Sequence, residues 1–364
     1  MQRKPDVVIW GAGMVAGVHA AACRSLGWPV RAVASRDSER AAALAAQVGA
    51  RTYEYDQLLP ERLGDIAIVA TPPANHVDDA VALLGSGYHV VVEAPMACTL
   101  ADADRLIAAE QAESRPVLYS EHLAASPVVD GLLADVGEIG HLTHLSARAI
   151  QAPPTWRSTR HHDWGGGATF DLGVHPVGLA LRTAAETDAG PPTQVAAVIT
   201  DAGTDREHAS IKLRFAGGLL ATIVVGWQPG ATPDWDLQAS SASAVLRAEL
   251  YPSPSLERNG DPVTGSGIGA GSAEPLSLVD DYGYAPQLTR FWANIRTGRP
   301  VPATSRLGRQ VLDVISAAHW SAGRNAIEVP LPFVGPRDRV PRQLLTTPPP
   351  RDYLRITSEV RPAL

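Results

Sequence analysis

The feature that most constrains the fold is a glycine-rich turn between a short apolar run and an alanine-rich segment, in VVIWGAGMVAGVHA, residues 7–20. Gly11, Gly13 and Ala16 form the pattern G-x-G-x-x-A. Glycines at the first two positions permit a tight turn and let a pyrophosphate approach the N-terminus of the following helix. Because ordinary glycine turns also produce this pattern, the surrounding elements decide its meaning.

The first third of the chain alternates apolar runs with helix-forming segments, as strands and crossover helices do in a parallel sheet. The runs expected to form strands are Val7 to Trp10, Val30 to Ala34, Ile66 to Ala70, Tyr88 to Val92 and Pro116 to Tyr119. The segments expected to form helices are Val15 to Leu26, Ser38 to Val48, Asn75 to Leu84 and Leu100 to Glu113. This order indicates an α/β fold that begins with a Rossmann dinucleotide-binding domain over residues 1–122.

From about residue 140 the pattern changes to longer alternating segments, which are typical of an open sheet with one packed face. They are HLTHLSARAI, TQVAAVITDA, ASIKLRFAGG and LLATIVVGWQ. We therefore predict a second α/β domain over residues 123–334, with a large open, mostly antiparallel sheet. Two helical patterns, Ala285 to Arg296 and Arg306 to Arg324, are expected to close it.

Two segments have no regular period. The run from Pro252 to Pro275 is rich in Gly, Ser and Pro and is expected to form a long mobile loop. The proline-rich residues 335–364 are expected to form an extended C-terminal tail that lies on a surface or on a partner subunit.

Composition excludes several classes of partner. The formal net charge is -7 and no block of like charge stands out, which argues against nucleic acid or a membrane surface and favours a small molecule. The N-terminal stretch lacks the apolar core of a signal peptide, and no run reaches transmembrane length. Cys23 and Cys98 have no metal-type spacing, so we expect no metal site and a cytoplasmic, thiol-reduced protein.

The context supports the interpretation of the glycine turn as a dinucleotide site. Direct contacts to the cofactor are expected from five residues of this turn, namely Gly11, Gly13, Met14, Val15 and Ala16. The second strand ends in Ser35, Arg36 and Asp37, and a basic side chain there favours the 2'-phosphate of NADP(H) over NAD(H), while NAD(H) remains an alternative. Asp37 is better placed as the N-cap of the next helix, and Arg36 has a second interpretation as a solvated surface charge.

Two further loops follow strands of the same sheet. In ATPPANH, residues 70–76, the rigid turn lies where a nicotinamide ribose is expected, so Thr71, Pro72 and His76 are candidate cofactor contacts. The alternative is a plain turn that caps the next helix. In HVVVEAPMACTL, residues 89–100, an apolar run leads into Glu93, Ala94 and Pro95, which we also assign to the cofactor site.

The segment HHDWGGGATFDLGVHPVGLA, residues 161–180, carries the residues best suited to proton transfer. The triple glycine permits a close backbone approach to a ligand. Asp171 and His175 are spaced i, i+4, so on a helix they share one face and can act as an acid or base with its orienting partner. The alternative is that Asp171 caps a helix and His175 is a buried core histidine.

The segments GAGMVAGVHA, ATPPANH, GYHVVVEAPMACTLADADRL, GGGATFDLGVHPVGLAL and YAPQLTRFWANIRTGRPVP, in this order, resemble the glucose-fructose oxidoreductase, inositol dehydrogenase and MocA family across residues 5 to about 332. The resemblance implies a Rossmann domain followed by an α/β domain, with nicotinamide between them. It also implies a homodimer or homotetramer formed through the C-terminal sheet, and oxidation or reduction of a hydroxyl carbon of sugars, cyclitols and related molecules.

The family's E-K-P motif falls on Glu93, Ala94 and Pro95, so the lysine that the family uses near the reacting oxygen is missing. Ala94 has no donor and no charge with which to replace it. The candidate replacements, beside Asp171 and His175 of the family's D-x-x-x-H motif, are His162, Asp163, His122 and Glu121. A local similarity to biliverdin reductases, which also lack this lysine, covers VEAPMACTLADADRL and LYSEHL but fails at Asp171 and His175.

These observations predict an NADP(H)-dependent oxidoreductase that transfers a hydride to or from a carbonyl, hydroxyl or imine carbon of a small molecule, with His175 as proton donor or acceptor. Loss of the lysine favours substrates that need less electrophilic help, such as an iminium. Two alternatives stay open. One is a redox-neutral enzyme that uses nicotinamide for elimination or epimerisation, and the other is a non-catalytic regulator that binds the cofactor. Trp156 and Trp164 suggest a substrate with an apolar or ring surface, unless they are core residues.

Overall fold

The computed structural model describes residues 3–155, 166–263 and 278–349. The described chain forms two compact units. The described parts of the first unit fall within Met1–Ala97, Asp102–Pro127 and Gly271–Gly308, and those of the second within Cys98–Ala101, Val128–Ala270 and Arg309–Leu364. The first unit therefore combines the start of the chain with a segment from near its end, and each unit is considered separately.

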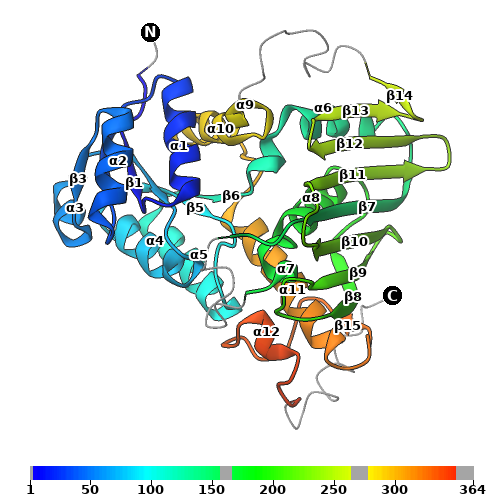
Figure 1. The fold of residues 1–364 in the computed structure, drawn as a ribbon. Helices are drawn as coiled ribbons and strands as arrows, with labels where there is room; N and C mark the ends of the chain where they lie inside the picture. The colour runs from blue at the N-terminus through cyan, green and yellow to red at the C-terminus, as the bar shows by residue number, and fades with distance from the viewer. Residues whose placement is uncertain (1–2, 156–165, 264–277, 350–364) are drawn as a thin grey trace. The chain divides into compact units, whose positions relative to one another are not determined.

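The first unit is built on a six-stranded parallel sheet with the order β3-β2-β1-β4-β5-β6 (Figure 1). Its strands are β1 (Val7–Trp10), β2 (Val30–Ala34), β3 (Arg51–Tyr53), β4 (Ile66–Val69), β5 (His89–Glu93) and β6 (Val117–Ser120). The central strands read as unbroken apolar runs because helices cover both faces of the sheet, and every residue of β1 and β4 is buried. The expected parallel α/β fold is thus confirmed.

Five α-helices connect these strands, together with a single 3-10 turn. They are α1 (Met14–Ser25), α2 (Ser38–Val48), α3 (Tyr55–Glu61), η1 (Pro73–Asn75), α4 (His76–Gly85) and α5 (Leu100–Glu113). The sequence did not predict β3 or α3. The side chains of β3 are exposed or only half-buried, so the strand carries no apolar run, and Pro60 inside α3 reads as a helix break.

Three elements complete the first unit, and they are η2 (His122–Ala125), α9 (Leu278–Asp281) and α10 (Tyr284–Thr297). The expectation that α10 closes the second domain is corrected. Ala285, Leu288 and Phe291 of α10 belong to the same apolar core as Ala16 and Ala20 of α1. Residues 278–308 therefore belong with the N-terminal sheet, and the expected linear boundary at residue 122 does not describe this returning segment.

The second unit is built on a nine-stranded sheet with the order β14-β13-β12-β11-β7-β10-β9-β8-β15. All neighbouring pairs are antiparallel except β7 and β10, which confirms the mostly antiparallel sheet. The strands are β7 (Leu142–Gln151), β8 (Pro192–Thr200), β9 (His208–Phe215), β10 (Leu220–Trp227), β11 (Asp234–Ser241), β12 (Val245–Tyr251), β13 (Ser255–Arg258), β14 (Asp261–Pro262) and β15 (Val329–Pro330).

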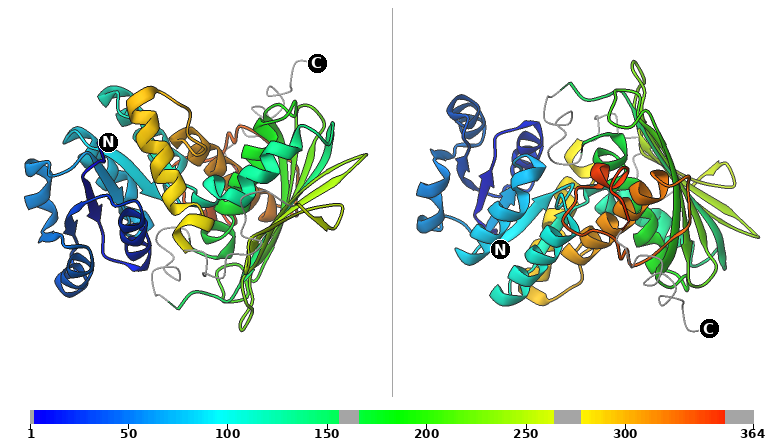
Figure 2. Two further views of the ribbon diagram at one scale, coloured as in Figure 1. Left: turned by 90° about the horizontal axis from the view of Figure 1, so that it is seen from above. Right: turned by 90° about the horizontal axis from the view of Figure 1, so that it is seen from below.

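The helices of the second unit lie on one face of this sheet (Figure 2). They are α6 (Pro127–Val136), α7 (Ala168–Asp171), α8 (Val174–Ala185), α11 (Ser305–Ala322) and α12 (Pro341–Leu344). Buried residues alternate with half-buried or exposed ones along β7, β9 and β11, as expected when one face is covered and the other is not.

Two expectations for irregular segments are corrected. The run that begins at Pro252 contains the strands β13 and β14, which extend the sheet instead of forming a loop, although residues 264–275 lie outside the described residues. The expected tail contains α12, and Pro341 and Leu344 are buried. Arg324 donates hydrogen bonds to the carbonyl groups of Leu344 and Thr347, so this part of the tail packs against the residues that follow α11.

Candidate functional site

The glycine turn has the geometry that a pyrophosphate cradle needs. Gly11 has φ of 115°, and a Cβ on it would overlap the backbone carbonyl of Ala70, so only glycine fits there. Its N–H donates to the carbonyl oxygen of Ala34 at 2.7 Å, which fixes the turn to β2. Ala16 is fully buried, and its small side chain lets α1 pack closely on the sheet.

The N-terminus of α1 is open. A Cβ on Gly13 would meet nothing within 4 Å, and no side chain caps the helix, so the first backbone N–H groups have no side-chain acceptor. Met14 is 63% exposed, and Val15 is half-buried. These residues fit an anionic group such as the pyrophosphate of a dinucleotide, which would be held by the N–H groups and the helix dipole.

The end of β2 carries the residues expected to discriminate between cofactors. Asp37 accepts from the backbone N–H of Arg40 at 3.0 Å and is the N-cap of α2, as predicted. Ser35 Oγ accepts from the Asp37 N–H at 3.1 Å, and Arg36 is exposed. The Arg36 side chain is therefore accessible, so that either a 2'-phosphate or water can pair with its guanidinium.

Sequence reasoning missed an aromatic pair at this end of the sheet. Trp10, the last residue of β1, stacks on Tyr55 of α3 with ring centroids 4.5 Å apart. Burial and the charge of Asp79 raise the pKa of Tyr55, against the opposing influence of Arg36 and Ser35. Tyr55 therefore shares its surroundings with the candidate specificity residues. Because α3 was not predicted, the position of this ring was not predicted either.

His76 links the two loops that follow β4 and β5. Its Nε2 lies 2.7 Å from the carbonyl oxygen of Thr71, and its Nδ1 lies 2.8 Å from that of Pro95. Thr71 also donates to Asp79 at 2.6 Å. The ring of His76 is buried, and burial lowers its pKa, against the raising influence of these two carbonyl groups. The ring of His76 therefore connects the two loops through Thr71 and Pro95. Pro72 is exposed on the first loop.

Glu93 makes its contacts inside the first unit. Its Oε1 lies 2.6 Å from Nε2 of His19 on α1 and accepts from Ser120 Oγ at 2.6 Å. Burial raises the pKa of Glu93, but the hydrogen bonds from His19 and Ser120 and the charges of His19 and His122 outweigh it and hold the pKa at about 2. Gln287 of α10 donates to Ser120 at 3.0 Å and extends the network. Glu93 therefore connects α1, the parallel sheet and, through Ser120, the returning helix α10.

Ala94 and Pro95 continue from this carboxylate. Ala94 is half-buried, and its N–H donates to Oε2 of Glu93 at 3.2 Å, whereas Pro95 is buried. Of the candidates to replace the missing lysine, Glu121 and His122 are buried in the same unit. Nδ1 of His122 lies 2.6 Å from the carbonyl oxygen of Tyr282, and its ring stacks on Tyr284 at 4.1 Å. The structure thus ties His122 to the start of α10.

The two residues predicted to form an acid–base pair, Asp171 and His175, both lie in the second unit. Asp171 is the last residue of α7, His175 lies in the first turn of α8, and Gly173 between them keeps helical backbone angles. Burial, opposed by His175 and assisted by the negative charge of Glu207, raises the pKa of Asp171 to about 6. The ring of His175 lies 5.4 Å from that of Trp235 on β11, which sequence reasoning also missed. A carboxyl group that titrates near neutrality beside an imidazole suits proton transfer.

The remaining predicted residues are not placed. His162, Asp163, Trp156 and Trp164 lie outside the described residues. Across the described ranges, no group of three or more His, Cys, Asp or Glu side chains is arranged to hold a metal ion, and no helix has both the length and the apolar character to cross a membrane.

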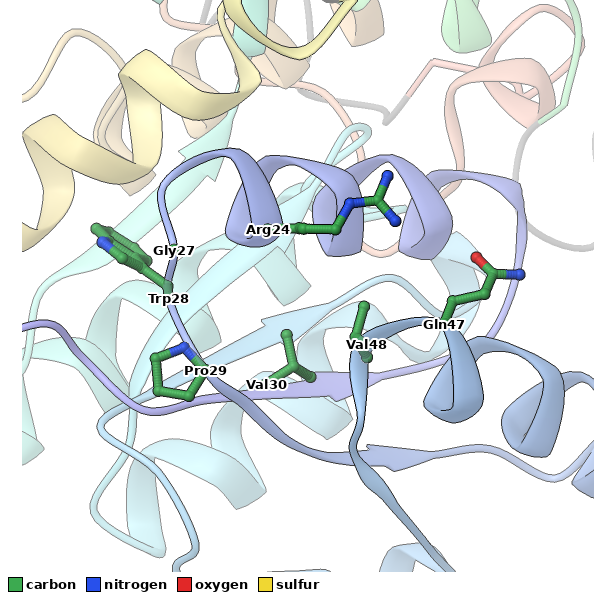
Figure 3. A pocket seen from close by; sticks show the side chains of 7 residues that line it. All are labelled: Arg24, Gly27, Trp28, Pro29, Val30, Gln47 and Val48. Atoms are coloured by element: carbon green, nitrogen blue, oxygen red, sulfur yellow. The ribbon is translucent and has the colours of Figure 1, made fainter.

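One hollow of about 440 Å³ lies elsewhere on the first unit (Figure 3). Arg24 and Gln47 lie at its rim, and Trp28, Val30 and Val48 form its apolar part. Because Val30 begins β2, the hollow lies at the edge of the sheet opposite to the Gly11 turn. It is therefore separate from the candidate cofactor cradle.

Sequence comparisons agree with both units. The family profile "Oxidoreductase family, NAD-binding Rossmann fold" matches residues 6–121, and the "GFO/IDH/MocA C-terminal domain" matches residues 132–244. An uncharacterized oxidoreductase, ORF334 of Rhizobium meliloti, is 30% identical over 82% of this chain and 90% of its own length. A dTDP-3,4-didehydro-2,6-dideoxy-alpha-D-glucose 3-reductase of Streptomyces violaceoruber is 32% identical over 61% of this chain and 66% of its own.

A solved structure shares the fold. GenD2 from gentamicin A biosynthesis, crystallised in complex with NAD, superimposes with a TM-score of 0.77 over 91% of this chain and 97% of its own, at 23% identity. At that identity the likeness establishes the fold alone.

Proposed function

We propose, because the chain belongs to the GFO/IDH/MocA family of NAD(P)-dependent oxidoreductases, that it is an NADP(H)-dependent enzyme acting on a carbonyl or hydroxyl carbon of a sugar-like small molecule. In this proposal the first unit binds the dinucleotide and the second supplies the proton through His175. A bound nicotinamide supplies or accepts the hydride.

The observation that carries the proposal is the half-buried Asp171 within the electrostatic influence of His175, with the pKa of the carboxyl group raised to about 6. In the reducing direction, His175 donates a proton to the substrate oxygen as hydride reaches the carbon. The negative charge of Asp171 then favours the protonated form of the His175 imidazole, which the next reduction needs. Reversal of these steps serves oxidation, since His175 then accepts the hydroxyl proton.

The missing lysine limits the substrate. Loss of one well-placed donor to a developing oxyanion costs about 3 kcal/mol of transition-state stabilisation. The substrate should therefore be more electrophilic than an ordinary ketose. A carbonyl beside a second carbonyl, as in the 3,4-didehydro sugar named for the Streptomyces violaceoruber relative, meets this condition, and so does an iminium. We favour a nucleotide-linked dicarbonyl sugar as the substrate class.

NADP(H) is favoured because Arg36 is exposed directly after β2 and no acidic residue precedes it there. Asp37 follows it, but its side chain is engaged in capping α2. A guanidinium pairs well with a 2'-phosphate, whereas a ribose hydroxyl is better matched by a carboxylate.

The test is a panel of simple ketones, dicarbonyl sugars, nucleotide-linked keto sugars and cyclic imines, with loss of reduced-nicotinamide absorbance as the signal. Parallel fluorescence titrations compare NADPH and NADH. His175→Ala should lower turnover by about 100-fold or more without weakening NADPH binding. His141→Ala, at an exposed position, is the matched control and should behave as the wild type. Full turnover in the His175 variant would remove it from the mechanism.

If NADPH binds tightly but no panel member oxidises it, a redox-neutral reaction or a regulatory role becomes the better explanation. The redox-neutral alternative has one observation in its favour. The chain has Asp171 and His175 of the family motif but not the lysine of the E-K-P motif. A substrate-dependent exchange of deuterium between labelled NADPH and product, without net oxidation, would support it.

A further inference from the structure

The second unit contains a buried carboxylate that the proposed reaction does not use directly. Glu207 lies just before β9 and is 2% exposed. A buried charge is costly unless it is fully hydrogen-bonded, so its partners show what it holds in place.

The partners of Glu207 are backbone N–H groups. Its Oε1 accepts from the N–H of Thr169 at 2.7 Å, and its Oε2 accepts from the N–H of Gly203. Thr169 is the second residue of α7, where N–H groups have no intrahelical acceptor. Glu207 therefore caps α7 from a part of the chain that is 38 residues away.

The glycine run of the sequence has its explanation here. Gly167 precedes α7 with φ of 112°, and a Cβ on it would clash with the carboxylate of Glu207. The close approach that these glycines predicted is thus made, for Gly167, by a side chain of the same protein. Any larger residue at this position would push the carboxylate from the helix terminus.

We propose that Glu207 is a positioning residue, which holds α7 in the register that presents Asp171 to His175 and biases Asp171 through its own negative charge. This inference rests on the proposed role of the Asp171 and His175 pair. Thr169, whose N–H Glu207 caps, lies two residues before Asp171 in the same turn, so a shift of this turn moves the acid directly.

Among the described residues, several charged groups act on Asp171 and Glu207 or lie near them. His175 of α8 lowers the pKa of Asp171, and Glu207 raises it, after the larger effect of burial. His319 of α11 is buried; burial lowers its pKa, while Glu207 raises it and Arg342 of α12 lowers it. The Arg342 guanidinium packs against Gly203, so that a Cβ there would overlap it. Elsewhere on α11, Asp313 pairs with Arg309 at 3.2 Å.

Two substitutions distinguish the capping hydrogen bonds of Glu207 from the effect of its negative charge. Glu207→Gln keeps an oxygen acceptor but removes the charge, whereas Glu207→Ala removes both. Glu186→Gln, at an exposed position just after α8, is the matched control. Each variant is also made in the Asp171→Asn background, and all are studied as full-length protein.

The first readout is hydrogen exchange of the segment 167–173. Glu207→Ala should raise exchange there by about tenfold, the fold-change that loss of a helix cap produces, while exchange in the central strands stays unchanged. Glu207→Gln should retain most of the protection.

The second readout is the pH at which Asp171 titrates, obtained from unfolding free energies with and without Asp171→Asn. Glu207→Gln should move this midpoint to lower pH.

Neither readout needs a substrate, so they test the positioning role even if no compound is turned over. With a substrate, Glu207→Gln should shift the acidic limb of the kcat profile and leave the KM for NADPH unchanged. The proposal is overturned if the exchange of residues 167–173 rises only in step with the whole second unit, or if the Asp171 midpoint does not move. Should Glu207→Ala fail to fold, the Glu207→Gln midpoint decides alone.

Discussion

At the scale of single residues, Asp171 is the group whose ionisation should be visible without any substrate. Its pKa is raised from 3.8 to about 6 by burial and by Glu207, against His175. The folded protein therefore binds this proton more tightly than the unfolded chain does. Between these two values the unfolded state holds fewer protons, so the free energy of unfolding should fall as pH rises.

We expect Asp171→Asn to remove this dependence. The loss in the wild type should approach about 3 kcal/mol between pH 4 and 6 and remain constant above it. Urea unfolding of both proteins at several pH values measures it. A variant whose unfolding free energy tracks that of the wild type across this interval would show that Asp171 titrates normally.

At the scale of elements, Glu93 joins α1, β6 and, through Ser120 and Gln287, α10. Its pKa is held at about 2, so its stabilising contribution is present above the unfolded value of 4.5 and is lost as pH falls toward 2. We expect Glu93→Gln to lower the free energy of unfolding at neutral pH by about 3 kcal/mol, since it weakens two charge-assisted bonds in the interior.

The same substitution should weaken NADPH binding, because His19 lies on α1, whose N-terminus is the candidate pyrophosphate cradle. Below about pH 4 the difference in stability from the wild type should shrink, which acid unfolding followed by circular dichroism measures. Glu113→Gln, at the exposed end of α5, serves as the control. Equal stability of Glu93→Gln and wild type at neutral pH would show that the network contributes little.

What the sequence predicts at this scale depends on whether a contact is local. The bounds of β1, β2, α2 and α5 follow from apolar runs and helix formers, and the structure confirms them. Local pattern also identified the G-x-G-x-x-A turn and the Asp171 and His175 spacing. Glu207 was missed because its role depends on a loop that meets the Gly167 turn across 40 residues, and a lone glutamate before a strand carries no signal for that.

At the scale of the whole molecule, local sequence pattern also did not predict which unit α10 packs in. Its apolar residues predict a helix, but they do not say which core it joins. Phe291 and Ala20 belong to one apolar core although they are far apart in sequence. The same holds for the nine-stranded sheet, whose neighbours β7 and β11 are separated by three intervening strands in the chain. Alternation predicts strands and a covered face, whereas strand order depends on long-range pairing.

The uncovered face of that sheet leads to the last prediction. In the described part of the second unit, no helix covers it (Figure 2). Arg148 pairs across it with Asp234 and Asp236 at 2.9 and 3.0 Å, and Arg247 also pairs with Asp236 at 3.0 Å. Val198 and Leu220 are 53% and 41% exposed. Charges that pair within the sheet, beside exposed apolar side chains, suit an interface between like subunits better than a solvated surface.

We therefore propose that two copies of the chain associate through this face, as the family resemblance suggested. Val224, half-buried at the centre of β10, would lie within such an interface. Val224→Glu should convert a dimer or tetramer into a smaller species, because it introduces an unpaired charge into buried apolar area. Ala46→Glu, at an exposed position on α2, controls for the added charge. Light scattering coupled to gel filtration gives the masses, and a wild type that elutes as a monomer of 38.4 kDa would exclude the interface.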